Sequence, residues 1–152
     1  MRIELVDAPN CVDGLVLIEQ ECFTHPLEKK QLRFLLQDSR SHFFCAYEDG
    51  DTPVGSVWLQ AVLDEGYIGN VAVRPAFRRR GIADALLDRL DIFAREKKLS
   101  FLTLEVREGN IPAIALYEKH GYTPVGRRPA YYHDPREDAV LMTKTDFSGD
   151  SE

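Results

Sequence analysis

Cysteine, positive charge and long hydrophobic runs are all scarce in this 152-residue sequence. The three cysteines form no CxxC pair, and the four histidines show no spacing typical of metal ligands. No apolar run approaches the roughly 20 residues of a membrane span. The start, MRIELVDAPN, also lacks the apolar core of a signal peptide. We therefore expect a reduced, metal-free cytoplasmic protein that has no membrane segment.

The charge balance limits the kinds of partner. Lys and Arg number 19 against 25 Asp and Glu, so the formal net charge is -6. Proteins that bind nucleic acid or membrane surfaces usually present a basic face, so we expect neither partner. With 44% hydrophobic residues, the chain predicts one compact domain over residues 1–146 and a disordered tail at 147–152. We expect a monomer, with a weak dimer as the alternative.

The spacing of apolar residues predicts a mixed α/β fold. Asn10, with Asp13 three residues on, is a start signal for the first helix, and the glycine of Asp49-Gly50-Asp51 predicts a tight hairpin. A strand–helix–strand order around residues 66–107 predicts a right-handed parallel crossover. Strands are expected at 2–6, 42–48, 53–63, 66–75, 101–107, 122–128 and 137–145, and helices at 11–22, 27–37, 82–97 and 111–119.

The segment RRRGIA, residues 78–83, gathers positive charge where a strand gives way to a helix. Unpaired N–H groups at a helix start can bind a diphosphate. Gly81 would allow close approach of the backbone, small Ala83 would keep the entry open, and the arginines would add charge-assisted hydrogen bonds. A solvated basic turn is the alternative, and these six residues alone favour neither interpretation. Nucleic-acid binding ranks third, because no other basic or aromatic platform accompanies the arginines.

Two later stretches carry candidates for acid–base chemistry. Glu105 interrupts the apolar strand FLTLEVR, where a carboxylate is costly without a partner or a role. The alternative is a structural ion pair with Arg107 or Arg127. Tyr117 follows on the next helix, seven residues after Asn110, the expected helix cap. Its hydroxyl is a candidate proton donor, and a packed core tyrosine is the alternative.

Taken in this order, the motifs resemble those of the GNAT superfamily of acyl-CoA N-acyltransferases over nearly the full chain. The R-x-x-G-x-A segment is similar to the family's pyrophosphate motif, and NVAV, residues 70–73, to the strand beside the pantetheine arm. The stretches LTLEVREGN, AIALYEKHGY and RRPAYYHDPREDAVLM resemble members that acetylate the N-terminal alanine of a ribosomal protein. The resemblance implies a mixed, twisted sheet of six to seven strands, flanked by about four helices, with splayed fourth and fifth strands.

The resemblance also implies the chemistry and the donor. The donor would be acetyl-CoA, used as a co-substrate without a metal, with Glu105 as the general base and Tyr117 as the general acid. The implied donor contacts come from the fourth strand, the arginine–glycine segment and the helix of Asn110: Val71, Ala72, Val73, Arg78, Arg79, Arg80, Gly81, Ile82, Ala83, Asn110 and Tyr117.

The implied acceptor is a protein N-terminus, such as that of a ribosomal protein. An α-amine is roughly one-seventh neutral at pH 7, against about four parts in ten thousand for lysine, which suits a carboxylate base. The stretch AYYHDPRED, residues 130–138, is expected to link the last two strands over the acceptor entrance. Tyr131 and Tyr132 would contact the peptide there, and Glu137 would attract a basic segment; a packed turn is the alternative. Acetylation of lysines or small amines, and non-catalytic acyl-CoA binding, stay open as alternative functions.

Overall fold

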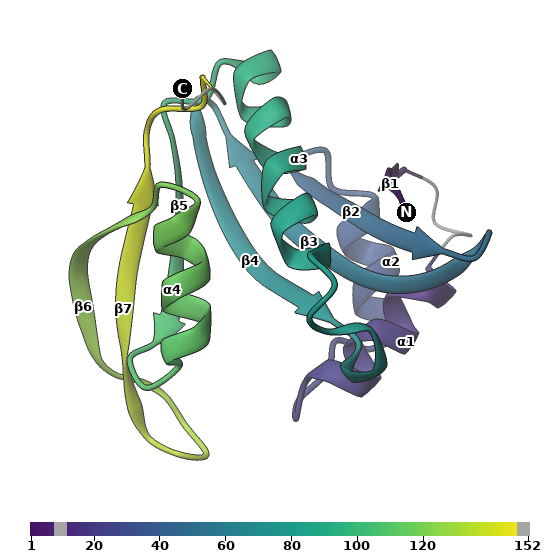
Figure 1. Ribbon diagram of the computed structural model, residues 1–152, viewed down its shortest axis with the longest axis horizontal. Helices are drawn as coiled ribbons and strands as arrows, with labels where there is room; N and C mark the ends of the chain where they lie inside the picture. The colour runs from purple at the N-terminus through teal and green to yellow at the C-terminus, as the bar shows by residue number, and fades with distance from the viewer. Residues whose placement is uncertain (8–11, 149–152) are drawn as a thin grey trace.

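An open sheet of seven strands with helices on both faces forms the architecture (Figure 1). The computed structural model describes residues 1–7 and 12–148. A 3₁₀ turn, Pro75–Phe77, comes just before the third α-helix. In these ranges the elements are β1 (Arg2–Val6), α1 (Asp13–Cys22), α2 (Lys29–Leu36), β2 (Ser41–Glu48), β3 (Thr52–Val62), β4 (Glu65–Val73), α3 (Ile82–Lys97), β5 (Phe101–Arg107), α4 (Ile111–Lys119), β6 (Thr123–Tyr132) and β7 (Glu137–Lys144).

The sheet is split between its two central strands. The strand order is β1-β2-β3-β4-β5-β7-β6, and β4 and β5 are the parallel pair that α3 connects, as the crossover prediction requires. Within the described residues, these two strands pair only where 65–67 lie beside 101–103. Beyond that point β4 stays with β3 and β5 stays with β7, so the sheet opens (Figure 1). The expected splay of the fourth and fifth strands is confirmed.

Two apolar clusters join the helices to the sheet. On the face that α3 and α4 cover, Leu86 and Leu90 of α3 pack with Leu102 of β5. On the face that α1 and α2 cover, Leu15 of α1 packs with Phe43 of β2. The three leucines of the first cluster are 0% exposed, and full burial of each contributes about 1.5–3 kcal/mol. The strands on both sides of the split are therefore packed against helices.

Ion pairs also tie α3 to the elements beyond the split. Asp91 of α3 pairs with Lys144 of β7 at 2.7 Å, and both side chains are nearly buried. Asp84, in the first turn of α3, contacts Lys119 at 2.7 Å and His120 at 2.8 Å, at the end of α4. Removing two charges from water offsets much of the attraction in such pairs, so we regard them as fixing relative position more than adding stability. These ion pairs fix the positions of α4 and β7 relative to α3.

Most of the expected elements are confirmed, with differences at their ends. The helix at 82–97 and the strand at 101–107 have the predicted bounds, and Gly50 in the β2–β3 hairpin has φ +80°. The second helix is shorter than expected, Lys29–Leu36, because a reciprocal Glu28–Gln31 capping box fixes its start. The first helix begins at Asp13, and the expected start signal Asn10 lies outside the described residues.

The end of the chain differs from the predicted pattern in two places. The expected link at 130–138 is shorter, because β6 continues to Tyr132 through a register shift that contains Ala130 at φ +51°. Phe147, where the tail was expected to start, is 6% exposed and its carbonyl accepts a hydrogen bond from Arg95. Residues 149–152 lie outside the described part.

Among residues 1–7 and 12–148, no helix is long and apolar enough to cross a bilayer. Across the same ranges, no three His, Cys, Asp or Glu side chains gather as metal ligands would.

Candidate active site

Two cavities open where β4 and β5 part. The first, which we call the arginine cavity, has a volume of about 470 Å³ and is lined by Arg78 and Arg79. The second, the glutamate cavity, has a volume of about 590 Å³ and is lined by Glu19 and Glu105. The two cavities lie side by side and share part of their lining, which we call the common wall. The wall consists of Cys22, Phe23, Val71, Asn110, Ala113 and Tyr117.

The start of α3 gives the arginine cavity an anion-binding cradle. Gly81 is the N-cap of α3 at φ +78°, and among the described side chains none caps this end. The first backbone N–H groups of the helix therefore lack helical partners and carry its partial positive charge. A Cβ atom on Gly81 would meet no protein atom within 4 Å. The cradle has both the donors and the open space that a diphosphate needs.

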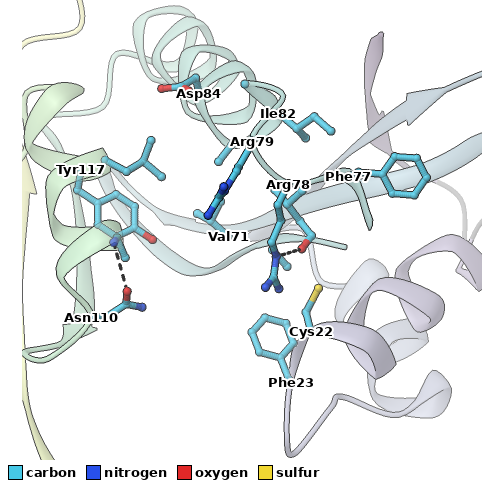
Figure 2. Close-up of a pocket in the computed structure, with 16 residues that line it drawn as sticks. Cys22, Phe23, Val71, Phe77, Arg78, Arg79, Ile82, Asp84, Asn110 and Tyr117 are labelled. Carbon is cyan, nitrogen blue, oxygen red and sulfur yellow. Dashed lines mark hydrogen bonds between the residues drawn. The ribbon is translucent and has the colours of Figure 1, made fainter. Parts of the chain in front are cut away.

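The three arginines before this cradle do not act alike. Arg78 and Arg79 line the arginine cavity, and the Arg78 Nε donates to the Val73 carbonyl at 2.9 Å. Figure 2 shows the Arg78 side chain reaching toward Cys22. Arg80 is not among the lining residues; it pairs with Glu48 of β2 at 3.0 Å. Of the three predicted donor contacts, two thus come to the cavity and Arg80 is held away from it.

The edge of β4 forms the floor of the arginine cavity. Val71, Ala72 and Val73, the donor contacts expected on this strand, all line it, and they lie beyond the last residue that pairs with β5. Their backbone groups on that side are left without a strand partner. Such an edge can hydrogen-bond an extended amide chain as a neighbouring strand would. Ile82 and Ala83, the other predicted contacts at the helix start, also line this cavity.

Tyr117 and Asn110 reach the common wall from α4. Burial raises the pKa of Tyr117 to about 12, so at neutral pH its hydroxyl is protonated and can only donate a proton. Figure 2 shows this hydroxyl directed into the arginine cavity. Asn110 is the predicted cap, since its Oδ1 accepts from the Ala113 N–H at 3.2 Å. Capping therefore holds Asn110 at the wall that both cavities share.

Glu105 reaches the glutamate cavity from β5. Along this strand Leu104 and Val106 are buried while Glu105 is half-buried, as the expected alternation requires. Its Oε2 accepts from the Arg128 Nε at 3.0 Å, so the arginine ion pair that was the alternative is present, with Arg128 in place of Arg107 or Arg127. Strand β7 lies between β5 and β6 and sets the register that brings Arg128 to this face.

The three predicted acceptor contacts, Tyr131, Tyr132 and Glu137, lie in different positions relative to the glutamate cavity. Tyr132 lines the glutamate cavity, and the Arg107 guanidinium lies over its ring at 4.4 Å. Tyr131 packs edge-on against Tyr132 with ring centroids 5.0 Å apart, is 46% exposed and lies outside the lining. Glu137 is engaged elsewhere: it pairs with Arg107 at 3.2 Å and accepts the Gly109 N–H at 2.7 Å. Tyr132 is thus the predicted acceptor contact that the geometry brings to the cavity.

The sequence predictions missed the side of the glutamate cavity that α1 and the segment after it provide. One signal was present: Glu19 falls on the apolar stripe of α1 with Leu15, Ile18 and Cys22, at the i, i+3, i+4, i+7 spacing of a buried face. A carboxylate on such a stripe indicates a polar role. The missed lining residues on this side are Glu19, Cys22, Phe23, Thr24, His25 and Leu27, and Trp58 of β3 was missed as well.

Comparisons with known proteins are consistent with this geometry. The Acetyltransferase (GNAT) family model matches residues 12–122. The chain is 34% identical over 128 residues to the ribosomal protein bS18-alanine N-acetyltransferase of Haemophilus ducreyi, covering 82% of this chain and 87% of that protein. It is 44% identical over 85 residues to the Escherichia coli (strain K12) protein of that name, covering 55% and 57%. The crystal structure of the Escherichia coli ribosomal-protein-S18-alanine N-acetyltransferase matches with a TM-score of 0.85 and 31% identity, over 95% of this chain and 94% of that one.

Proposed function

Because the chain belongs to the GNAT family of acetyltransferases, we propose that it moves an acetyl group from acetyl-CoA to the α-amine of a protein N-terminus. The proposed acceptor is the N-terminal alanine of a ribosomal protein, the acceptor named for the relatives above. The observation that carries the proposal is the common wall between the two cavities. A donor in one cavity and an amine in the other would meet there, in the gap between β4 and β5.

The arginine cavity is the proposed donor site. The N–H groups at the start of α3 would bind the diphosphate, with Arg78 and Arg79 adding charge-assisted hydrogen bonds. The free edge of β4 at 71–73 would bind the amide groups of the pantetheine arm. Acetyl-CoA supplies a thioester whose carbonyl carbon is open to attack by a neutral amine.

The glutamate cavity is the proposed acceptor site, and Glu105 begins the chemistry there. Glu105 accepts the proton of the acceptor ammonium, directly or through water, so that the nitrogen lone pair can attack the carbonyl carbon. A backbone N–H of residues 71–73 donates to the developing oxyanion. As the carbon–sulfur bond breaks, Tyr117 gives its proton to the departing thiolate, and the second proton that the nitrogen loses as the amide forms returns to the Tyr117 oxygen, directly or through water. Holding both reactants in line can supply roughly 7–11 kcal/mol of the barrier reduction.

The acceptor assignment predicts a clear preference among peptides. At pH 7 the neutral fraction of an α-amine exceeds that of lysine roughly three-hundredfold, so a peptide with a free N-terminal alanine should react far faster than its Nα-blocked, lysine-containing counterpart. The ratio of the two reaction rates should fall as the pH is raised, because the neutral fraction of lysine then increases more than that of the α-amine. Mass spectrometry of peptides starting with alanine or serine, and of blocked peptides with an internal lysine, measures this. Faster modification of the internal lysine would assign the enzyme to lysine acetylation instead.

Tyr117→Phe should lower kcat about tenfold, and a matched control lies beside it. An effect of this size is below the usual range of about a hundredfold to ten-thousandfold for acid–base catalysis, because a thiolate leaves readily without full protonation. The ring centroids of Tyr122 and Tyr117 lie 5.9 Å apart. Within the described residues, the buried Tyr122 hydroxyl has no hydrogen-bond partner. Tyr122→Phe should therefore leave turnover unchanged. Steady-state rates with saturating acetyl-CoA compare the two variants, and equal losses in both would contradict the role of Tyr117.

We further propose that the enzyme acts in the cytoplasm as a monomer. Its net charge of -6 complements a basic ribosomal protein, which supports a protein partner over nucleic acid. Size-exclusion chromatography with light scattering should give one species near 17.3 kDa. A stable species of twice that mass would overturn the monomer.

A further inference from the structure

A second carboxylate lies in the glutamate cavity, and the proposed chemistry does not use it. Glu19 of α1 is 6% exposed and lines this cavity, the proposed acceptor site. Its Oε1 accepts a hydrogen bond from the backbone N–H of Leu27 at 2.7 Å, eight residues further along the chain. The bond therefore reaches from α1 to the end of the connection that leads into α2.

That connection, residues 23–27, forms one wall of the acceptor site, and we call it the acceptor wall. Phe23, Thr24, His25 and Leu27 line the glutamate cavity, although these residues belong to no helix or strand. His25 approaches Asp134 of the β6–β7 loop, with Nε2 and Oδ2 3.7 Å apart. The acceptor wall thus lies against the far rim of the site.

Two neighbouring sets of hydrogen bonds fix the end of the acceptor wall. The Glu28–Gln31 capping box starts α2, with the Gln31 Oε1 accepting the Glu28 N–H at 2.8 Å. One residue earlier, the Leu27 N–H is bound by Glu19. Without that carboxylate the Leu27 N–H would have no hydrogen-bond partner among the described residues, and an unsatisfied donor away from water is costly. This partly buried bond is therefore the link between α1 and the shape of the acceptor wall.

Burial carries a cost at Glu19 that the hydrogen bond partly offsets. Desolvation raises the pKa of the Glu19 carboxyl, while the Leu27 N–H acts in the opposite direction. Half-exposed Glu105 is in a different situation, because Arg128 balances its charge. A carboxylate kept in an apolar stripe at such a cost indicates that its contact has a function.

We propose that Glu19 is a positioning residue for the acceptor, which holds the acceptor wall through the Leu27 N–H and so sets affinity for the acceptor peptide. The inference rests on the proposed function of the site. Glu19 acts through the wall, and its oxygen, more than its charge, is the required feature. The contact is made at Leu27, which lines the glutamate cavity and not the arginine cavity, so the donor site and the reacting atoms should be little affected.

Two substitutions at Glu19 separate the hydrogen bond from the charge. Glu19→Gln keeps an oxygen that accepts from the Leu27 N–H, whereas Glu19→Met has a similar length and accepts nothing. We expect Glu19→Met to raise the acceptor KM about tenfold, the upper end for the loss of one ordinary hydrogen bond, with kcat and the acetyl-CoA KM within about twofold of wild type. Glu19→Gln should stay within about twofold in all three constants.

The matched control is Glu21→Met on the same helix. The Glu21 carboxylate pairs with Arg74 at 3.0 Å and is not among the residues that line the glutamate cavity. This control should leave the acceptor KM unchanged. An acceptor KM that rises as much in Glu19→Gln as in Glu19→Met would overturn the proposal in favour of a charge contact with the acceptor. A fall in kcat with an unchanged acceptor KM would overturn it as well.

Hydrogen exchange gives a readout that needs no acceptor. The Leu27 amide should exchange slowly in wild type and in Glu19→Gln, and at least about tenfold faster in Glu19→Met. Unchanged protection in Glu19→Met would overturn the inference even where turnover is altered. If wild type acetylates no N-terminal peptide, the proposed function fails, while the exchange result still decides whether Glu19 holds the wall.

Melting temperatures check that the Gln variant folds, and the sign follows from the pKa. Because the folded state raises the Glu19 pKa, its contribution to stability is present at low pH and is lost as the pH rises through the raised value. The amide of Glu19→Gln does not ionise, so the variant does not lose this stability as the pH rises. Glu19→Gln should therefore melt higher than wild type at pH 7 and equally at low pH, and a lower melting temperature at pH 7 would show that the amide does not keep the bond.

Discussion

Glu105→Gln is expected to lower kcat/KM for an N-terminal alanine peptide by about a hundredfold to a thousandfold, the range of a lost general base. The amide oxygen can still accept from the Arg128 Nε, which lies 3.0 Å from the carboxylate in wild type. The substitution therefore preserves the packing and the contact with β6 but removes the group that takes the proton. Initial rates with both substrates varied should place the loss in kcat, with each KM within about threefold.

Glu108→Gln is the matched control for this loss. Glu108 follows β5, contacts Arg127 and is not among the residues that line either cavity. Its replacement should leave every rate constant unchanged. Full activity in Glu105→Gln would remove Glu105 from the chemistry. If wild type binds acetyl-CoA by calorimetry but acetylates no amine, the chain is instead an acyl-CoA-binding module.

The elements around the split could be predicted from the sequence because local patterns determine them. The apolar run at 101–107 predicts a strand on which Leu102, Leu104 and Val106 share one face, and Asn110 predicts the start of α4 through its own side chain. The same locality applies to Gly81, whose positive φ is a property of the turn before α3. The resemblance then joined these pieces into the expected fold.

Contacts that depend on the order of strands could not be predicted in this way. Arg128 reaches Glu105 because β7 inserts between β5 and β6, a non-sequential order that no local pattern encodes. Arg80 was grouped with its neighbours as a phosphate contact, yet Glu48 of β2, 32 residues earlier, pairs with it. Glu19 was missed for a different reason, since its stripe indicated burial while its partner, a backbone N–H after a helix end, leaves no trace in residue type.

The glycine of the cradle allows the donor site to be tested separately from the chemistry. Gly81→Ala is expected to weaken coenzyme A binding at least about tenfold, because the added methyl group would occupy the open space beside the N–H groups that we assign to the diphosphate. Apart from Gly81 and its chain neighbours, no atom of the described residues lies within 4 Å of that methyl position, so the fold is not overpacked. The positive φ of +78° adds a strain of about 1 kcal/mol to the folded state. Calorimetry with coenzyme A measures the affinity, and thermal melting measures the strain.

Gly50→Ala supplies the same strain away from the cavity. Gly50 has φ +80° in the β2–β3 hairpin, and a Cβ atom there would also meet nothing within 4 Å. The two variants should therefore lose similar stability, whereas Gly50→Ala should bind coenzyme A as wild type does. Equal affinities in the two variants would mean that the start of α3 does not bind the diphosphate. Because binding is measured without an acceptor, that result would reject the donor site whatever the fate of Glu105 as the base.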